Sequence, residues 1–247
     1  MKLPYDEIIV NGDSYSAPVG IVYGNVLSEK LNIPVTNIAA AGSNNDRITR
    51  STIEQVLSKL NTSNRLLVIV GWSFIRRIEV WYYGTNQLVN ARIHDKNSSE
   101  PHKNPKFVTL DVLSQLNEIT LEQKCLINED LFVHKQLTDF YSNVYLLSQF
   151  LQNNSVDYLF FSAAKNVEVP VHCFPYIENL QQVQKVIQDP RILDLHNFYI
   201  SDWASKNDPE ANPTTGHLST TGHAKFSEVL LEKLNDIQSH QTTQIRR

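Results

Sequence analysis

Short apolar runs alternate with helix-like segments along the first seventy residues. The run Ile8-Ile9-Val10 ends at Asn11-Gly12-Asp13, which is typical of a buried strand that meets a turn. Valines and leucines at helical spacing follow it and predict a helix. Repetition of this pattern predicts strands at residues 7–10, 34–39 and 66–70 and helices at 18–31 and 48–60. Because the strands are almost wholly apolar, we expect a parallel sheet covered by helices on both faces.

The rest of the chain is less regular. We expect a β-hairpin at residues 78–89 around Gly84-Thr85-Asn86, and a polar surface loop at 91–106. Further predicted elements are helices near 110–116, 133–151 and 226–237, a strand at 156–161, a strand or strand-like segment at 192–195, and a frayed tail at 239–247. The pattern therefore predicts an α/β fold in a single domain, residues 1–247, with an insertion at about 74–130 after the third strand.

Composition and charge exclude several classes of protein. Of the 247 residues, 41% are hydrophobic, which is enough for a sizeable core, and 22 basic against 26 acidic residues give a net charge of −4. That balance argues against a nucleic-acid partner held by a basic face. No apolar run approaches the roughly 20 residues that cross a bilayer, and the acidic N-terminal stretch is unlike a signal peptide. We therefore expect a soluble cytoplasmic protein, although action inside a virus particle is left open.

The two cysteines, Cys125 and Cys173, are far apart in the sequence. They support neither a disulfide framework nor a CxxC metal or redox site, and we expect no metal and no cofactor. His172 precedes Cys173, but adjacent side chains of an extended chain point to opposite sides. We therefore do not interpret this pair as a thiol nucleophile with its base. The oligomeric state is not legible in the sequence.

Candidate chemistry gathers at the expected carboxyl ends of the strands, where sites form in open parallel sheets. Asn11-Gly12-Asp13-Ser14, Ala41-Gly42-Ser43-Asn44 and Gly71-Trp72-Ser73 follow the first three strands, and residues 216–223 precede the last helix. Together they bring a serine, the N–H groups of glycine turns and a histidine to one rim. These are the parts of an acyl-transfer site, namely a nucleophile, a base and donors for an oxyanion.

In these blocks the chain resembles the SGNH hydrolases, also called the GDSL esterase/lipase family. Gly12-Asp13-Ser14 matches the first block, Gly42 the second, and His217-Leu218-Ser219-Thr220-Thr221-Gly222-His223 the last, in the family's order. The resemblance implies a three-layer α/β/α, flavodoxin-like fold, with Ser14 as nucleophile and His217 as general base. It also implies that the N–H groups of Ser14 and Gly42 contribute to the oxyanion hole.

Two positions depart from the family pattern. Ser73 stands where the third block has an asparagine that donates to the oxyanion, so Ser73 itself, Asn44 and Asn45 are the candidates for that role. Thr214 stands where the family has the aspartate that orients the histidine. The candidate orienters are Thr214, Asp208, Glu210 and a backbone carbonyl, unless a Ser–His dyad suffices.

Other residues near the rim have both a structural and a functional interpretation. Asp13 is expected to stabilise the turn. Asp13 and Trp72 are also candidate substrate contacts, and the alternative for Trp72 is core packing. His223 is interpreted as structural. A charged group follows the third strand and contains Arg76, Arg77 and Glu79. For this group a surface ion pair is favoured over a substrate clamp.

The sequence thus predicts a serine hydrolase, an esterase or deacylase that forms an acyl-Ser14 intermediate. Its expected substrate is a small-molecule or glycan ester, such as an O-acetylated carbohydrate or a short-chain acyl ester, and acyl transfer to a sugar hydroxyl instead of water is left open. The alternative is a weak or inactive member of the family that binds a glycan or a protein partner. A nucleotide-binding domain is disfavoured because the first turn lacks both GxGxxG and GxxxxGK[ST] and carries Asp13.

Overall fold

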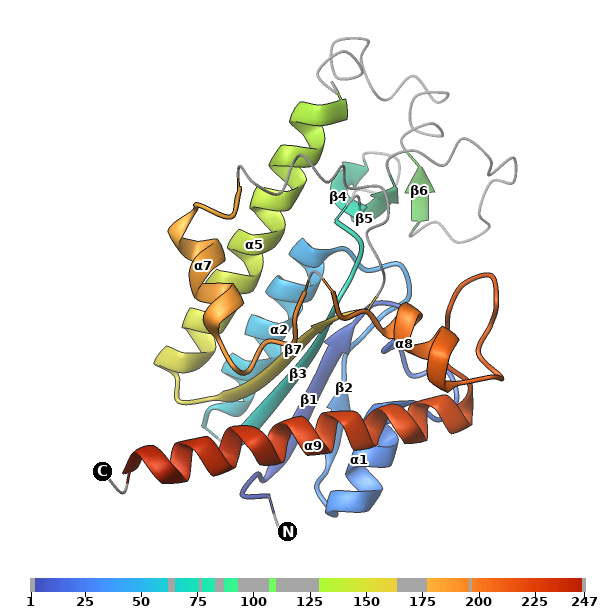
Figure 1. Cartoon of the computed structure of the whole chain (residues 1–247). Helices are drawn as coiled ribbons and strands as arrows, with labels where there is room; N and C mark the ends of the chain where they lie inside the picture. The colour runs from blue at the N-terminus through green and yellow to red at the C-terminus, as the bar shows by residue number, and fades with distance from the viewer. Residues whose placement is uncertain are drawn as a thin grey trace.

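Four parallel strands form the central sheet of the computed structural model (Figure 1). They are β1 (Glu7–Gly12), β2 (Val35–Asn37), β3 (Leu66–Trp72) and β7 (Asp157–Ser162), in the spatial order β2-β1-β3-β7. The structure describes residues 3–61, 65–75, 77–82, 87–92, 107–109, 129–163, 177–195 and 197–245. The order is that of the first strands of a flavodoxin-like sheet, and the predicted α/β class is confirmed.

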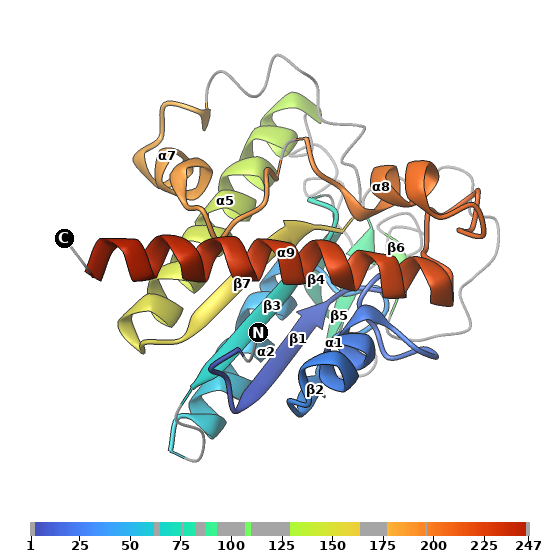
Figure 2. The ribbon, with the colours of Figure 1, turned by 60° about the horizontal axis from the view of Figure 1, so that its bottom comes forward.

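Helices cover both faces of this sheet, which makes three layers (Figures 1 and 2). Along β3, Val68 and Val70 face the core that α2 (Asn45–Lys59), α5 (Glu129–Asn153) and α7 (Gln181–Gln188) cover. Leu67 and Ile69 face the other core, under α1 (Tyr23–Leu31), α8 (Ile200–Asn207) and α9 (Thr220–Ile245). Both sets are fully buried because successive side chains of a strand point to opposite faces. The apolar run therefore supplies two cores at once.

A second, smaller sheet follows β3. It contains β4 (Arg77–Tyr82), β5 (Gln87–Arg92) and β6 (Phe107–Thr109), in that order. The antiparallel pairing of β4 with β5 confirms the predicted hairpin, and β6 joins β5 in parallel. The predicted turn at residues 84–86, most of the predicted loop at 91–106 and the predicted helix near 110–116 lie outside the described residues.

Several boundaries differ from the prediction. The first helix begins at Tyr23 rather than near residue 18, because the chain turns through Pro18 and Gly20, which has φ +79°, before it becomes helical. Residues 192–195 form no strand, although Ile192 makes an isolated bridge to Phe160 of β7. The tail predicted to fray from residue 239 instead continues α9 to Ile245.

Two short helices, α7 and α8, were not predicted. Each has eight residues, and each buries only two of them. In α7 these are Val183 and Val186, and in α8 they are Ile200 and Ala204. The apolar residues of each helix lie at helical spacing, but eight residues are fewer than the window of about 11–18 residues in which this spacing predicts a helix, and helices this short depend on tertiary packing.

Candidate functional site

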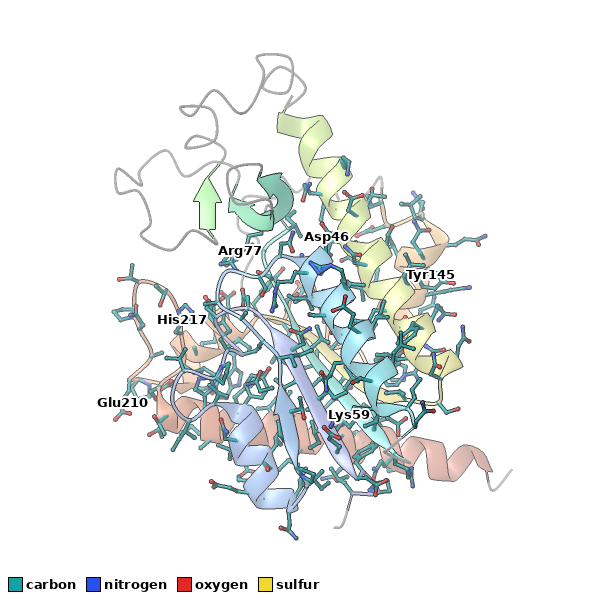
Figure 3. The ribbon with its side chains drawn as sticks, turned by 180° about the vertical axis from the view of Figure 1, so that it is seen from behind. Asp46, Lys59, Arg77, Tyr145, Glu210 and His217 are labelled. Atoms are coloured by element: carbon teal, nitrogen blue, oxygen red, sulfur yellow. The ribbon has the colours of Figure 1, made fainter. Side chains whose placement is uncertain are left out.

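Ser14 and His217 meet at the carboxyl end of the parallel sheet. Ser14 follows β1, and His217 lies in the loop before α9. The Oγ atom of Ser14 and the Nε2 atom of His217 are 2.8 Å apart, a hydrogen bond that joins positions 203 residues apart in sequence. Figure 3 shows His217 and Arg77 toward the same end of the sheet, and Lys59, the last residue of α2, toward the opposite end. The structure thus brings together the two residues predicted as nucleophile and base.

The turn that carries Ser14 depends on Gly12. This residue has φ +154°, and a Cβ atom there would lie 2.5 Å from the Ser16 Oγ and 2.7 Å from the Gly71 carbonyl oxygen. No other residue fits so close to β3. After Gly12, the Asp13 carboxylate accepts a hydrogen bond from the Tyr15 N–H at 3.1 Å, and its carbonyl accepts from the N–H groups of Ser16 and Ala17. Ser14 therefore lies on a tightly braced turn.

Asp13 also lies in a buried charged network. Its Oδ2 atom accepts hydrogen bonds from the Ser73 hydroxyl at 2.8 Å and from Nη1 of Arg77 at 2.9 Å. The same guanidinium nitrogen lies 3.3 Å from the Ser43 carbonyl oxygen, which accepts from it. The Arg77 and Asp13 side chains are only 4% and 0% exposed. The prediction of a surface ion pair for Arg77 is therefore wrong: the pair is buried and ties together the loops after β1, β2 and β3.

The imidazole of His217 lies flat against an aromatic ring. The rings of Tyr15 and His217 are stacked, with centroids 4.3 Å apart and planes 6° from parallel. The Tyr15 hydroxyl donates a hydrogen bond to the carbonyl of Thr215. Burial lowers the pKa of His217 below its ordinary value of 6.5, Asp13 opposes this shift, and Arg77 adds to it. His217 is therefore neutral at pH 7 and can accept a proton from Ser14.

The predicted orienters of His217 have other partners. Thr214 is exposed, and its N–H donates to the Asn212 side chain at 2.9 Å. The carboxylate of Asp208 accepts from the N–H and the hydroxyl of Ser219, at 2.7 and 2.8 Å. Glu210 is exposed. Within the described part of the chain, the imidazole of His217 makes one hydrogen bond, to Ser14. Neither Thr214 nor Asp208 therefore forms a hydrogen bond with the ring.

The candidate oxyanion donors divide into two kinds. The hydroxyl of Ser73 donates to Asp13, and the side chain of Asn44 caps α2 by accepting the Arg47 N–H at 2.9 Å. Asn45 holds the backbone of Ser73, whose N–H donates to the Asn45 side chain at 2.9 Å. By contrast, the backbone N–H groups of Ser14 and Gly42 donate to no acceptor among the described residues. Gly42 has φ +80°. Among the described residues, these two N–H groups therefore have no protein acceptor.

Trp72 and Asp13, the candidate substrate contacts, are both buried. The Trp72 ring is fully enclosed and packs edge-on against Phe140 and Phe160, with centroids 6.0 and 5.5 Å away. Its position is that of a core residue, which is the alternative interpretation given above. The carboxylate of Asp13 is enclosed by Ser73 and Arg77. Neither side chain is open to a substrate in this structure.

Sequence reasoning missed Tyr15 as a residue of the site, and it interpreted Arg77 as a surface residue. Tyr15 directly follows the candidate nucleophile, and that adjacency was the available signal. For Arg77 the signal was weaker, because arginine is seldom buried and nothing in the local sequence distinguishes a buried arginine from an exposed one. Among the described residues, no three metal-ligating side chains gather in one place, and the described helices include none that is long and apolar enough for a bilayer.

Several solved structures are similar to this chain. The chain is similar in structure to the psychrotrophic esterase EstA from a Pseudoalteromonas species, with 11% identity, a TM-score of 0.49, and coverage of 95% of this chain and 99% of that chain. It is also similar to a member of the lipolytic protein G-D-S-L family from Veillonella parvula, with 11% identity, a TM-score of 0.44, and coverage of 92% and 96%. An acetyl xylan esterase, AlAXEase, gives 15% identity, a TM-score of 0.46, and coverage of 92% and 98%.

With such low identities and TM-scores below 0.5, these likenesses leave the activity to be argued from the residues of the chain itself. Among curated proteins no match is found. The profile of a family of unknown function, DUF6071, matches residues 19–213, a stretch that begins after Ser14 and ends before His217. Because this match covers well over half of the chain, the protein belongs to the DUF6071 family.

Proposed function

We propose that this protein is a serine hydrolase of the SGNH type, which cleaves a carboxylic ester through an acyl-Ser14 intermediate. One observation carries the proposal: the 2.8 Å hydrogen bond between the Ser14 hydroxyl and His217 Nε2. A serine hydroxyl is a poor nucleophile unless a base takes its proton. A neutral, half-buried imidazole at hydrogen-bond distance is such a base.

The reaction follows from these groups. His217 takes the proton of Ser14 while Oγ attacks the ester carbonyl carbon, and the carbonyl oxygen becomes an oxyanion. The backbone N–H groups of Ser14 and Gly42 donate to this oxyanion, and each such donor is typically worth about 10²–10³ in rate. The imidazolium then protonates the leaving alcohol as the C–O bond breaks. Water, deprotonated by His217, releases the acid from the acyl-serine and restores both residues.

The substrate class is a carboxylic ester with a short acyl group, and an O-acetylated carbohydrate is one member of it. Hydrolysis and acyl transfer share every step up to the acyl-serine. They differ only in whether water or a sugar hydroxyl takes the acyl group from Ser14. A series of p-nitrophenyl esters of increasing chain length, assayed with and without added sugar acceptors, separates these two outcomes.

The test of the proposal is covalent labelling. A fluorophosphonate probe should modify the wild-type chain at Ser14, and Ser14→Ala should abolish labelling and lower p-nitrophenyl acetate hydrolysis by roughly 10³-fold or more. Ser205→Ala is the matched control, since Ser205 is an exposed serine on α8, and it should behave as wild type. Equal inertness of the wild type and Ser14→Ala would contradict the proposal.

A second candidate function is binding of a glycan or protein partner without turnover. It is favoured by one observation, namely that the Ser73 hydroxyl and the Asn44 side chain are both engaged inside the protein. A site left with backbone donors alone stabilises an oxyanion less well. Glycan-array binding that is equal in wild type and Ser14→Ala, without labelling or hydrolysis in either, would favour this candidate over the esterase.

A further inference from the structure

A histidine that acts as a base needs something to hold its ring in place. In serine proteases, removing the carboxylate that does this lowers kcat by about 10⁴. No carboxylate among the described residues is recorded as a hydrogen-bond partner of the His217 ring. On the basis of the proposed function, we propose that Tyr15 is the positioning residue that holds His217 against Ser14, in place of a carboxylate.

Tyr15 and His217 form a stacked pair. The Tyr15 and His217 rings are 4.3 Å apart at their centroids and 6° from parallel, so the tyrosine face fixes the plane of the imidazole. Tyr15 is 4% exposed, which leaves its ring no free rotamer toward solvent. Its backbone N–H donates to Asp13 at 3.1 Å. The ring on which the imidazole stacks is therefore buried and belongs to a residue whose backbone is hydrogen-bonded to Asp13.

The hydroxyl of Tyr15 contacts the loop that carries His217. It donates to the carbonyl of Thr215, two residues before His217. The same loop is closed by Asn212, whose side chain accepts from the Thr215 N–H at 3.0 Å and whose N–H donates to the His217 carbonyl at 2.9 Å. Tyr15 therefore contacts both the ring of His217 and the loop that carries it. Tyr15 directly follows Ser14 in the chain, so its side chain links the segment that carries the nucleophile to the base.

The Tyr15 ring also interacts with the charge that His217 gains during the reaction. When Ser14 attacks, His217 becomes an imidazolium, and a cation over a tyrosine face is attracted to it. The other charged or titratable groups that act on His217 are Asp13, which favours the imidazolium, and Arg77, which opposes it. His223 also lies close enough for the charges of the two histidines to oppose each other. The stacked ring thus supports the base both before and after proton transfer.

The experiment removes the ring and the hydroxyl separately. Tyr15→Leu and Tyr15→Met lack the ring. Each should lower the rate of fluorophosphonate labelling of Ser14 and kcat for p-nitrophenyl acetate by roughly 10²-fold, with little change in KM. A displacement of a catalytic group by about 1 Å has an effect of this size. Tyr15→Phe keeps the ring and should lose only about fivefold. Tyr158→Phe is the control, a buried tyrosine whose hydroxyl binds Asp189 away from Ser14, and it should match wild type.

A second readout does not depend on activity. A ring stacked on an aromatic face has its protons shifted upfield in NMR spectra, so the His217 signals, assigned by their loss in His217→Gln, should lie upfield in wild type and Tyr15→Phe. They should return to ordinary positions in Tyr15→Leu or Tyr15→Met. Ordinary His217 shifts in wild type, or labelling of either ringless variant at the wild-type rate, would overturn the role of Tyr15. Wild-type protein that is never labelled but shows the upfield shift would instead refute the hydrolase and leave the stacked pair intact.

Discussion

His223 is a buried imidazole that the proposed reaction does not use. It lies in the first turn of α9, 8% exposed, near the ring of Tyr23. Burial lowers its pKa to about 4, the charge of Asp208 opposes this shift, and His217 adds to it. In the unfolded chain the same group has an ordinary pKa of 6.5. Between these two values the unfolded chain binds a proton that the folded chain does not.

This difference predicts a loss of stability in acid. Above pH 6.5 His223 is neutral in both states, and as the pH falls toward 4 the free energy of unfolding should drop by about 3 kcal/mol on its account. Urea unfolding at pH 7, 5.5 and 4 measures the drop. In His223→Phe, which keeps a buried ring, the free energy of unfolding should depend less steeply on pH. His217→Gln measures the smaller contribution of the other histidine to this dependence. An unchanged slope in His223→Phe would show that the ring is not buried as a neutral group.

At the scale of one element, the start of α9 explains the pattern His-x-Ser-x-x-Gly. Ser219 caps the helix, because its hydroxyl oxygen accepts the Gly222 N–H at 3.0 Å. Asp208, from the end of α8, accepts two hydrogen bonds from Ser219. A Cβ atom at Gly222 would lie 1.9 Å from Asp208 Oδ2. Glycine is thus required here by the close approach of Asp208 and not by helix geometry.

We therefore expect Gly222→Ala to destabilise the protein although alanine is the better helix former. In a free helix interior this change gains about 1 kcal/mol, whereas here overpacking should cost about 1–3 kcal/mol in the free energy of unfolding. Chemical denaturation measures it. The control is the same change in an Asp208→Ala background, where the clash is gone and the added cost should disappear. Equal costs of Gly222→Ala in both backgrounds would contradict this account.

At the scale of the whole molecule, Arg77 connects the two sheets. It is the first residue of β4, in the small sheet, and its guanidinium contacts Asp13 and Ser73 at the end of the parallel sheet. Three loops that are far apart in sequence are thereby held by one buried cation. A charge removed from water so completely is tolerated only while its partner is present.

Arg77→Met should therefore cost about 3–5 kcal/mol, because it leaves the Asp13 carboxylate buried without its cation. The double variant Arg77→Met/Asp13→Asn should recover part of that loss, and a double-mutant cycle of unfolding free energies measures the coupling. Lys135→Met is the control, since its pair with Asp139 on α5 is exposed, and it should change stability by no more than about 0.5 kcal/mol. Strictly additive effects of the Arg77 and Asp13 changes would contradict a coupled buried pair.

The layered fold could be read from the sequence alone. Apolar strands alternating with helical spacing predict a parallel sheet, and the side-chain periods of strand and helix decide which residues are buried, as Val68 and Leu67 illustrate on opposite faces. The same pattern places Ser14 at the end of a strand and His217 just before the last helix, and the motifs around them allowed the two to be proposed as a pair. The helices α7 and α8 were not predicted, because eight residues are too few for a helical period to be distinguished.

Tertiary structure decided the partners. Spacing along a chain says which face a side chain occupies, but not which residue some 200 positions away it will contact. For that reason the burial of Arg77 against Asp13, the binding of Asp208 to Ser219, and the stacking of Tyr15 on His217 appear only in three dimensions. The order of apolar and polar residues is enough to predict the layers and to name the residues capable of chemistry. The meeting of distant loops at one end of the sheet determined what holds them, because contact energies depend on distances that only the folded chain defines.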